Sequence, residues 1–266
     1  MRTKHALAIV FIAAIAAACT PALTNDEAAA ALDEASASGS AASLTATSID
    51  LTTSFTIGMA VDHAAQEIHD YVVSQLPCAR VTLTGATLTI EYGALPGTCV
   101  FHGHTFHGTH QITVMANDMA QVIVQHTWTS LSDGQTTISG TATVTWSFAD
   151  PSRRVMHDVT WTRLSDGRTG TGTGDVTQTP LAGSVLVGFQ ETGSRSWHGA
   201  RGTWTLESMD VQWRWVDAVP QAGEYLLTTP FGKSASLSFS RTAPSTIHVL
   251  LTSGTKSFDF DVTTVP

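Results

Sequence analysis

The chain after Val81 is dominated by a strict alternation of apolar residues with threonine or serine. In "ATVTWSFAD" (142–150), the apolar side chains take every second position and the hydroxyl side chains take the positions between them. Successive side chains of a β-strand point to opposite faces, so a period of two predicts half-buried strands. The pattern continues in "TWTLESMDVQWRWVD", "SASLSFS", "STIHVLL" and "KSFDFDV".

An internal repeat gives these strands their connections. "TWTSLSDGQTTISGT" (127–141) and "TWTRLSDGRTGTGT" (160–173) align at an offset of 33 residues. Asp133-Gly134 and Asp166-Gly167 are hairpin turn signals, because glycine tolerates positive φ. Each copy then reaches a Gly-Thr pair, at Gly140 and Gly172, that we expect to open a new strand. A single hairpin cannot bury its apolar face alone, so neighbouring units must pair.

The expected fold is therefore mainly β, with roughly a dozen antiparallel strands at spacings of about 8–12 residues. The sequence leaves open whether they form a sandwich, a barrel or a curved meander. One amphipathic helix, about 57–76, precedes them in "TIGMAVDHAAQEIHDYVVSQLPC", with Pro77 as its stop. We expect residues 51–266 to form a single helix-plus-β domain.

The first residues have the form of an export signal. In "MRTKHALAIVFIAAIAAACT", Arg2 and Lys4 precede an apolar run that is too short for a permanent membrane span. Small residues before Cys19 resemble a bacterial lipobox, although Ala16 stands where leucine is usual. Residues 1–18 are thus a predicted signal peptide and Cys19 a predicted lipidation site, with a plain secretory peptide as the alternative. Thr20, in place of aspartate, favours the outer membrane of a Gram-negative bacterium.

Residues 19–50 are predicted to be a lipidated tether. "LTNDEAAAALDEA" begins with helix-start chemistry, with Thr24 or Asn25 as the cap and Asp26 and Glu27 in the first turn. "SASGSAASLTATS" after it is typical of a flexible linker that would hold the folded body away from the membrane.

The three cysteines divide in a simple way. If Cys19 carries the lipid, Cys78 and Cys99 remain, and an even remainder in an exported protein predicts a disulfide. Such a bond would close a loop of about 20 residues and contribute roughly 3 kcal/mol. It would join the end of the predicted helix to the β body.

The charge balance excludes some partners. Removal of Arg2 and Lys4 with the signal leaves 11 Lys and Arg residues against 22 Asp and Glu residues. An acidic surface argues against nucleic acid and against a polybasic membrane patch. The membrane contact that we expect is the N-terminal lipid, and the expected partner is an envelope protein or a glycan.

Four histidines in "CVFHGHTFHGTHQ" (99–111) raise the possibility of a metal site. His102, His104 and His110 share strand parity, and imidazoles that converge within about 2.1 Å of one point bind Zn²⁺ or Cu²⁺. The repeat argues against convergence, because Gly103 aligns with the turn glycines and His110 aligns with Ala142 on the buried face. No cofactor is therefore expected, with zinc or copper as the open alternative. His126 and His157 are predicted to be hydrogen-bonded histidines in or beside the core.

Other candidate chemistry is sparse. Trp213 and Trp215 share a strand face and could bind sugar rings, although strand tryptophans are more often core residues. The chain carries no G-x-S-x-G, H-E-x-x-H or P-loop motif, and "GTGTG" (170–174) follows a hairpin turn without a helix that could hold phosphate. We therefore expect no catalytic residues.

Several segments resemble a group of uncharacterised bacterial lipoproteins, chiefly from myxobacteria and relatives. They are "LTNDEAAAALDEA", "TIGMAV", "SQLPCARVTLTGATLTIEYGALPGTC", "GHTFHGTH", "DPSRR", "TWTRLSDGRTGTGTGD" and "WVDAVPQAGEY…TPFGK". The resemblance covers nearly the full length and implies export, lipidation and a β-rich fold. The resulting expectation is a lipid-anchored protein of the cell envelope with a non-enzymatic binding or scaffold role. A metal-binding protein or metal-dependent enzyme, and a carbohydrate-binding surface protein, are the alternatives.

Overall fold

The computed structural model describes residues 21–147, 149, 151–183, 187–214, 216–217 and 219–264. The predicted signal peptide and Cys19 lie outside these residues, as does Trp215. The described chain is mainly β, as predicted, and most of it belongs to one antiparallel sheet whose strands follow one another in sequence order. Of the three architectures that the sequence left open, the structure is the curved meander.

The main sheet has 13 strands in sequence order. Its strands are β1 Arg80–Thr84, β2 Thr87–Tyr92, β5 His107–Asn117, β6 Gln121–Ser132, β7 Thr136–Ser147, β8 Ser152–Arg163, β9 Arg168–Pro180, β10 Gly188–Gly199, β11 Gly202–Arg214, β12 Ala222–Thr228, β13 Ser234–Ala243, β14 Thr246–Ser253 and β15 Lys256–Thr263. Among the described strands, only the small hairpin of β3 Val100–Phe101 and β4 His104–Thr105, between β2 and β5 in the chain, lies outside this order. A short 3₁₀ turn, η1 Leu181–Gly183, follows β9.

The hairpin turns lie where the repeat predicts them. Gly134 and Gly167 have φ of 84° and 71°, in the left-handed region that favours glycine. The Gly-Thr pairs at 140 and 172, however, lie inside β7 and β9 and do not open them. The strands already start at the Asp-Gly turns. Gly140 instead lets the main chains of β7 and β8 approach closely, because a Cβ at this position would lie 2.2 Å from the carbonyl oxygen of Asp158.

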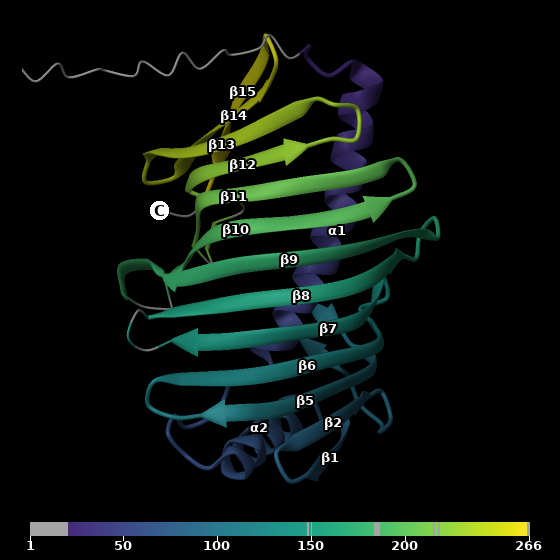
Figure 1. Ribbon diagram of the computed structural model, residues 1–266, viewed down its shortest axis with the longest axis vertical. Helices are drawn as coiled ribbons and strands as arrows, with labels where there is room; N and C mark the ends of the chain where they lie inside the picture. The colour runs from purple at the N-terminus through teal and green to yellow at the C-terminus, as the bar shows by residue number, and fades with distance from the viewer. Residues whose placement is uncertain are drawn as a thin grey trace, which may run out of the picture.

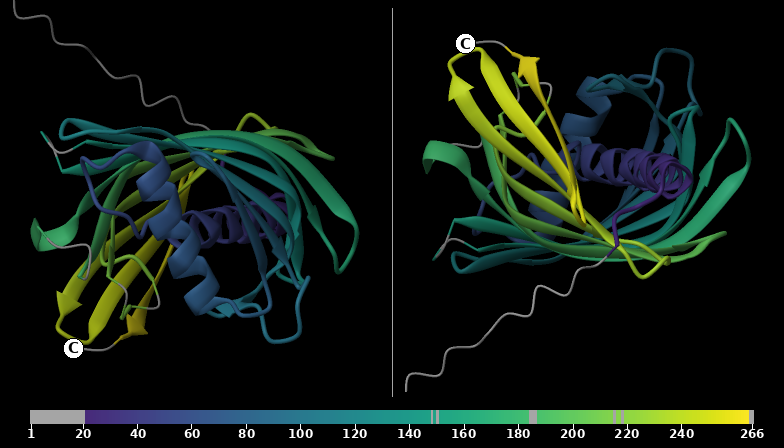
Figure 2. Two further views of the ribbon diagram at one scale, coloured as in Figure 1. Left: turned by 90° about the horizontal axis from the view of Figure 1, so that it is seen from below. Right: turned by 90° about the horizontal axis from the view of Figure 1, so that it is seen from above.

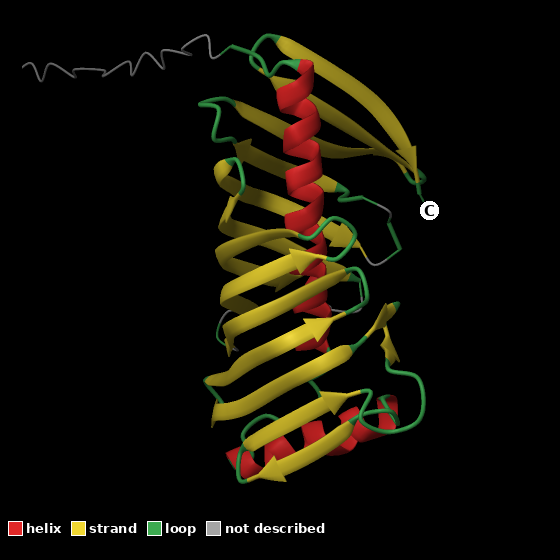
Figure 3. Cartoon of the chain, turned by 90° about the vertical axis from the view of Figure 1, so that its right-hand side faces the viewer, coloured by secondary structure: helices red, strands yellow, loops and turns green. Residues whose placement is uncertain are grey.

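Two helices pack against the sheet (Figure 1). Helix α1 Asn25–Asp50 runs along the long axis of the molecule, and α2 Val61–Gln75 covers the end formed by β1, β2 and β5. Viewed along the long axis, the sheet curls around α1, which lies on its concave face (Figure 2). The side view in Figure 3 shows the strands stacked along the length of α1. No helix in the described part of the chain is long and apolar enough to cross a membrane.

Helix α1 corrects the prediction of a flexible tether. The helix is capped by Thr24, one of the two expected caps, in a capping box in which Thr24 and Glu27 bond each other's main-chain amides, and it continues without a break to Asp50. Ala37, Ala41, Leu44 and Ile49 are buried in the main core. The linker-like composition misled the prediction because small residues are what a helix needs when it fits inside a curved sheet lined with tryptophan. The residues from 25 onward therefore belong to the folded domain.

Ion pairs fix α1 to the sheet along its length. Asp33 accepts from Arg163 and Arg168 at 2.7 and 2.6 Å, beside the β8–β9 turn. Glu27 contacts Lys233 at 2.6 Å near one end of the helix, and Asp50 contacts Arg153 at 2.6 Å at the other. These partly exposed pairs contribute modestly to stability, but they orient the helix in the sheet.

The predicted disulfide is present and ties α2 to the sheet. Cys78 and Cys99 are bonded, with their Cα atoms 5.4 Å apart, and both are buried. Cys78 lies between α2 and β1, and Cys99 precedes β3. The helix is shorter than predicted, ending at Gln75, and it buries Ala64, Ile68 and Val72 against the neighbouring strands.

Replacement of both cysteines by serine is expected to lower the free energy of unfolding by about 3 kcal/mol, because the unfolded chain regains the entropy of an open loop. Urea unfolding of the oxidised protein and of the Cys78→Ser/Cys99→Ser variant would measure this. The wild-type protein in excess reductant should match the variant. Equal unfolding midpoints for the oxidised protein and the variant would contradict the prediction.

Candidate functional site

The predicted histidine cluster divides into two separate places. His102 occupies the β3–β4 turn, with φ of 46°, and its ring stacks on Phe101. His104, on β4, contacts Asp133 at 3.0 Å through Nδ1 and Ser43 at 3.3 Å through Nε2. His104 therefore links the small hairpin both to the β6–β7 turn and to helix α1.

His110 lies instead in the core, in a buried hydrogen-bonded chain. Its Nδ1 is 3.3 Å from the hydroxyl oxygen of Tyr92, and its Nε2 is 3.0 Å from Nδ1 of His126. All three side chains are buried. Burial raises the pKa of Tyr92, lowers that of His110 well below its ordinary value and lowers that of His126 to about 3. Both imidazoles are thus neutral near pH 7, and His126 is the core histidine that its strand pattern predicts.

The structure does not bring His102, His104 and His110 together. Among the residues that the structure describes, no group of three His, Cys, Asp or Glu side chains is arranged to hold a metal ion. The pair His110 and His126 supplies only two imidazoles, and each nitrogen facing the other is used in their mutual contact. The arrangement stabilises neutral imidazoles in the core, where they stack on Trp128 with ring centroids 5.5 and 5.9 Å away.

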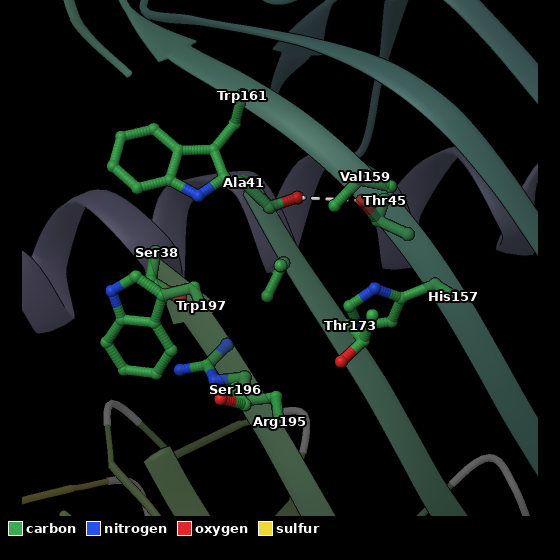
Figure 4. A pocket seen from close by; sticks show the side chains of 12 residues that line it. Ser38, Ala41, Thr45, His157, Val159, Trp161, Thr173, Arg195, Ser196 and Trp197 are labelled. Carbon is green, nitrogen blue, oxygen red and sulfur yellow. Dashed lines mark hydrogen bonds between the residues drawn. The ribbon is translucent and has the colours of Figure 1, made fainter. Parts of the chain in front are cut away.

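A second polar group lies between α1 and strands β8, β9 and β10 (Figure 4). It surrounds a cavity of about 20 Å³ lined by Thr45, His157, Arg195 and Trp197, among others, which is room for about one water molecule. Within the described chain, Nδ1 of His157 and Nε of Arg195 have no hydrogen-bond partner. Burial, followed by the charge of Arg195, lowers the pKa of His157 to about 4. The group is therefore a cation beside a neutral imidazole.

This inner group is a poor catalytic site. The cation of Arg195 stands 5.8 Å from the centre of the Trp197 ring, a distance typical of a cation–π contact. The nearby carboxyl group of Glu191 is already occupied, because it accepts from Gln178 and Ser208 at 2.9 and 3.1 Å. Since α1 covers the cavity and its volume is that of one water, a substrate has no room there.

The "GTGTG" segment has a packing role. Its glycines, on the inner face of β9, make room for large side chains of the neighbouring strands. A Cβ on Gly170 would lie 2.4 Å from the Trp161 ring, and one on Gly172 would lie 2.9 Å from Cβ of Trp197. A Cβ on Gly174 would lie 2.3 Å from Nε2 of His157. The alternation of glycine with large residues across strands allows the sheet to close around α1.

Of the tryptophan pair that the sequence raises for sugar binding, the structure describes only Trp213. Trp213 is partly buried, and its Nε1 donates to the hydroxyl oxygen of Tyr225 at 3.0 Å. Trp215 lies outside the described residues. Four other tryptophans are buried in the inner core, namely Trp128, Trp161, Trp197 and Trp204.

The outer face of the sheet carries a row of hydroxyl side chains interrupted by one carboxylate. Residues paired from strand to strand share a face, and the row crosses from β6 to β12. Its members are Thr127, Thr141, Asp158, Thr173, Ser196, Thr205 and Thr228. The side chain of Asp158 is exposed, and its carboxylate makes no hydrogen bond or salt bridge within the described chain.

Beside Asp158 the outer face has a shallow, open hollow. A depression of about 280 Å³ is lined by polar side chains of β8 to β11 and by the buried Gly172 and Trp197. The polar residues are Asp158, Thr171, Thr173, Ser196, His198 and Thr203. Nδ1 of His198 is 3.2 Å from Oγ1 of Thr203, which positions the ring at the rim.

Sequence reasoning did not select Asp158 or His198. The sequence did hold one signal. Asp158 and His198 both occupy outward-facing positions of strands whose other outward-facing residues are mostly threonine or serine, and Asp158 is the one acidic residue in the hydroxyl row. A strand pattern does not show which residues of different strands become neighbours, so the hollow could not be recognised from sequence.

Comparison with known protein families, with curated proteins and with solved structures finds no match for this chain.

Proposed function

We propose that the protein is a lipid-anchored, non-enzymatic protein of the cell envelope that binds a glycan through the hollow on its outer face. The observation that carries the proposal is the exposed hollow of about 280 Å³, lined by hydroxyl groups, one carboxylate and one imidazole. On the concave face, the cavity beside α1 has only about 20 Å³, and α1 and four tryptophans pack into the core on that side.

The chemistry of the hollow is complementary to a sugar. A carboxylate can accept two hydroxyl hydrogens from a diol, and threonine hydroxyls both donate and accept. His198 adds a flat ring edge at the rim. Neighbouring strands lie about 4.8 Å apart, so the hydroxyl row offers a regular series of partners to a polymer with repeated hydroxyl groups.

Export and lipidation rest on the N-terminal sequence. A cation-flanked apolar run that ends at Cys19 supports removal of residues 1–18 and acylation of Cys19, and Thr20 supports an outer-membrane destination. The disulfide is consistent with an oxidising compartment. Incorporation of labelled palmitate in cells, with loss of label in Cys19→Ser, tests this part by itself.

Glycan binding is expected to depend on Asp158. Cosedimentation with purified peptidoglycan and binding to an array of bacterial glycans would be measured for the wild type, Asp158→Asn and His198→Ala. The Asp158→Asn variant should bind glycan roughly tenfold more weakly or worse, because it loses two charge-assisted hydrogen bonds. His198→Ala should have a smaller effect.

The matched control is Glu207→Gln, which removes an exposed carboxylate from the outer face of β11 outside the hollow. It should bind as the wild type does. If no glycan binds, or if Glu207→Gln and Asp158→Asn weaken binding equally, the hollow is not a glycan site.

A further inference from the structure

The C-terminal edge strand carries the two most exposed aromatic side chains among the described residues of the sheet. Phe258 and Phe260 on β15 are 64% and 44% exposed, and their rings are 5.9 Å apart. By register, Phe258 lies beside Leu251 and Phe260 beside Val249, so the two rings extend an apolar face that is buried farther in. Two adjacent exposed phenylalanines on a sheet edge mark a contact surface.

This edge is also where the main chain is open. Strand β15 pairs with β14 alone among the described strands, which leaves its outer amides and carbonyls without strand partners. Exposed edges of this kind invite pairing with other chains unless something covers them. In Figure 1 β15 lies at one end of the long axis, where the described part of α1 also begins.

The start of the described chain is bonded to the same edge. The amide of Leu23 donates to Oγ of Ser253 at 3.0 Å, and Nζ of Lys256 donates to the carbonyl oxygen of Leu23 at 3.3 Å. Cys19 is four residues before Leu23, so its Cα lies within about 14 Å of Leu23 even in a fully extended chain. An acyl anchor on Cys19 therefore holds the β14–β15 hairpin close to the lipid headgroups.

We infer that the β15 edge, with Lys256, Phe258 and Phe260, lies against the bilayer surface to which Cys19 is anchored. The inference rests on the proposed lipidation. Aromatic rings are favourable at the depth of the headgroups, and the lysine meets lipid phosphate there. The headgroups and their water also satisfy the open edge of β15.

The charges around the edge agree with this orientation. Asp259 and Asp261 occupy the opposite face of β15, and Nδ1 of His248 contacts Asp261 at 3.0 Å. The phenylalanine face can therefore turn toward lipid while the carboxylates turn to water. By register the two phenylalanines lie on the opposite face of the sheet from the hydroxyl row, so in this pose the glycan hollow on β8 to β11 is turned away from the lipid.

Hydrogen exchange of tethered protein tests the inference without requiring cellular lipidation. Because Cys78 and Cys99 are bonded to each other, Cys19 is the only free thiol of a chain that lacks residues 1–18. That thiol would be coupled to a maleimide lipid in vesicles of phosphatidylethanolamine and phosphatidylglycerol. We expect exchange of the β15 amides to slow by about tenfold on the vesicles relative to untethered protein.

Strand β1, the other edge of the sheet, is the internal control and should exchange at the same rate in both states. Phe258→Ser/Phe260→Ser should remain tethered and folded but lose most of the β15 protection. Unchanged β15 exchange in the tethered wild type would overturn the inference. So would β15 protection in free protein that grows with concentration, since it would assign the edge to a second copy.

The two proposals fail in different ways. Protection of β15 in the tethered protein, together with absence of palmitate labelling in cells, would reject the native anchor and keep the edge as a lipid-contacting surface. Palmitate labelling without β15 protection would keep the anchor and reject the docked edge.

Discussion

Acidification from about pH 6.5 to about pH 4.5 is expected to remove about 2 kcal/mol of folding free energy through His126, and His110 should add to the loss in the same direction. Both rings are buried and neutral, and burial lowers the pKa of His126 from 6.5 to about 3 and that of His110 well below 6.5. In the unfolded chain the same groups bind protons as the pH falls through 6.5. Protonation therefore favours unfolding, so this stability is fully present above pH 6.5 and is lost as the pH falls.

Urea unfolding at several pH values would measure the slope. His157, whose pKa is lowered to about 4, should add to it in the same direction. The carboxyl groups with lowered pKa, such as Asp166, titrate in the unfolded chain near pH 4, so they affect stability mainly below the histidine window.

Two variants make the assignment specific. His110→Phe/His126→Leu should flatten the dependence on pH between about 4.5 and 6.5, whatever its effect on stability at neutral pH. Thr160→Ala, at an exposed position of β8 that carries no titratable group, should leave the slope as in the wild type. A double variant as sensitive to acid as the wild type would show that these histidines do not cause the loss.

Trp161→Ala is expected to lower the free energy of unfolding by about 3–5 kcal/mol, since it empties a large space between β8, β9 and α1. Gly170→Ala should cost about 1–3 kcal/mol for the opposite reason, because its new Cβ would lie 2.4 Å from the Trp161 ring. The three atoms nearest to the new Cβ all belong to the Trp161 ring, so the Trp161→Ala background removes this clash. The second substitution should then be nearly neutral.

The double-mutant cycle, measured by chemical denaturation, should give a coupling energy of about 1–3 kcal/mol between the two positions. Gly39→Ala is the matched control. A methyl group on Gly39 would have no atom within 4 Å apart from those of its own helix and neighbours, so it should stabilise α1 by about 0.5–1 kcal/mol. Additive effects of the Trp161 and Gly170 substitutions would show that the glycine does not serve to accommodate the ring.

The sequence was informative wherever a local rule governs the structure. The period of two predicted the strands, because pleating forces alternate side chains to opposite faces. The Asp-Gly pairs predicted the turns at Gly134 and Gly167, and the cysteine count predicted the bond between Cys78 and Cys99. Parity and the repeat also placed His110 and His126 at the buried face.

Helix α1 shows where local rules end. Alanine, serine and threonine in residues 36–48 resemble a linker, because composition reports only that the segment lacks large apolar groups. Its partners are Trp161 and Trp197, which come from strands more than a hundred residues later. Small residues fit there only because the glycines of β9 allow the tryptophans to turn inward.

By itself, then, the sequence determined the strands, their hairpins, the disulfide and the absence of familiar catalytic motifs. The tertiary structure alone decided that the strands form one sheet curled around α1. It also decided that Asp158 and His198 share a hollow and that the first described residues meet β15 at one edge. These three outcomes depend on strand register and sheet curvature, which bring together residues from different strands and which no local pattern records.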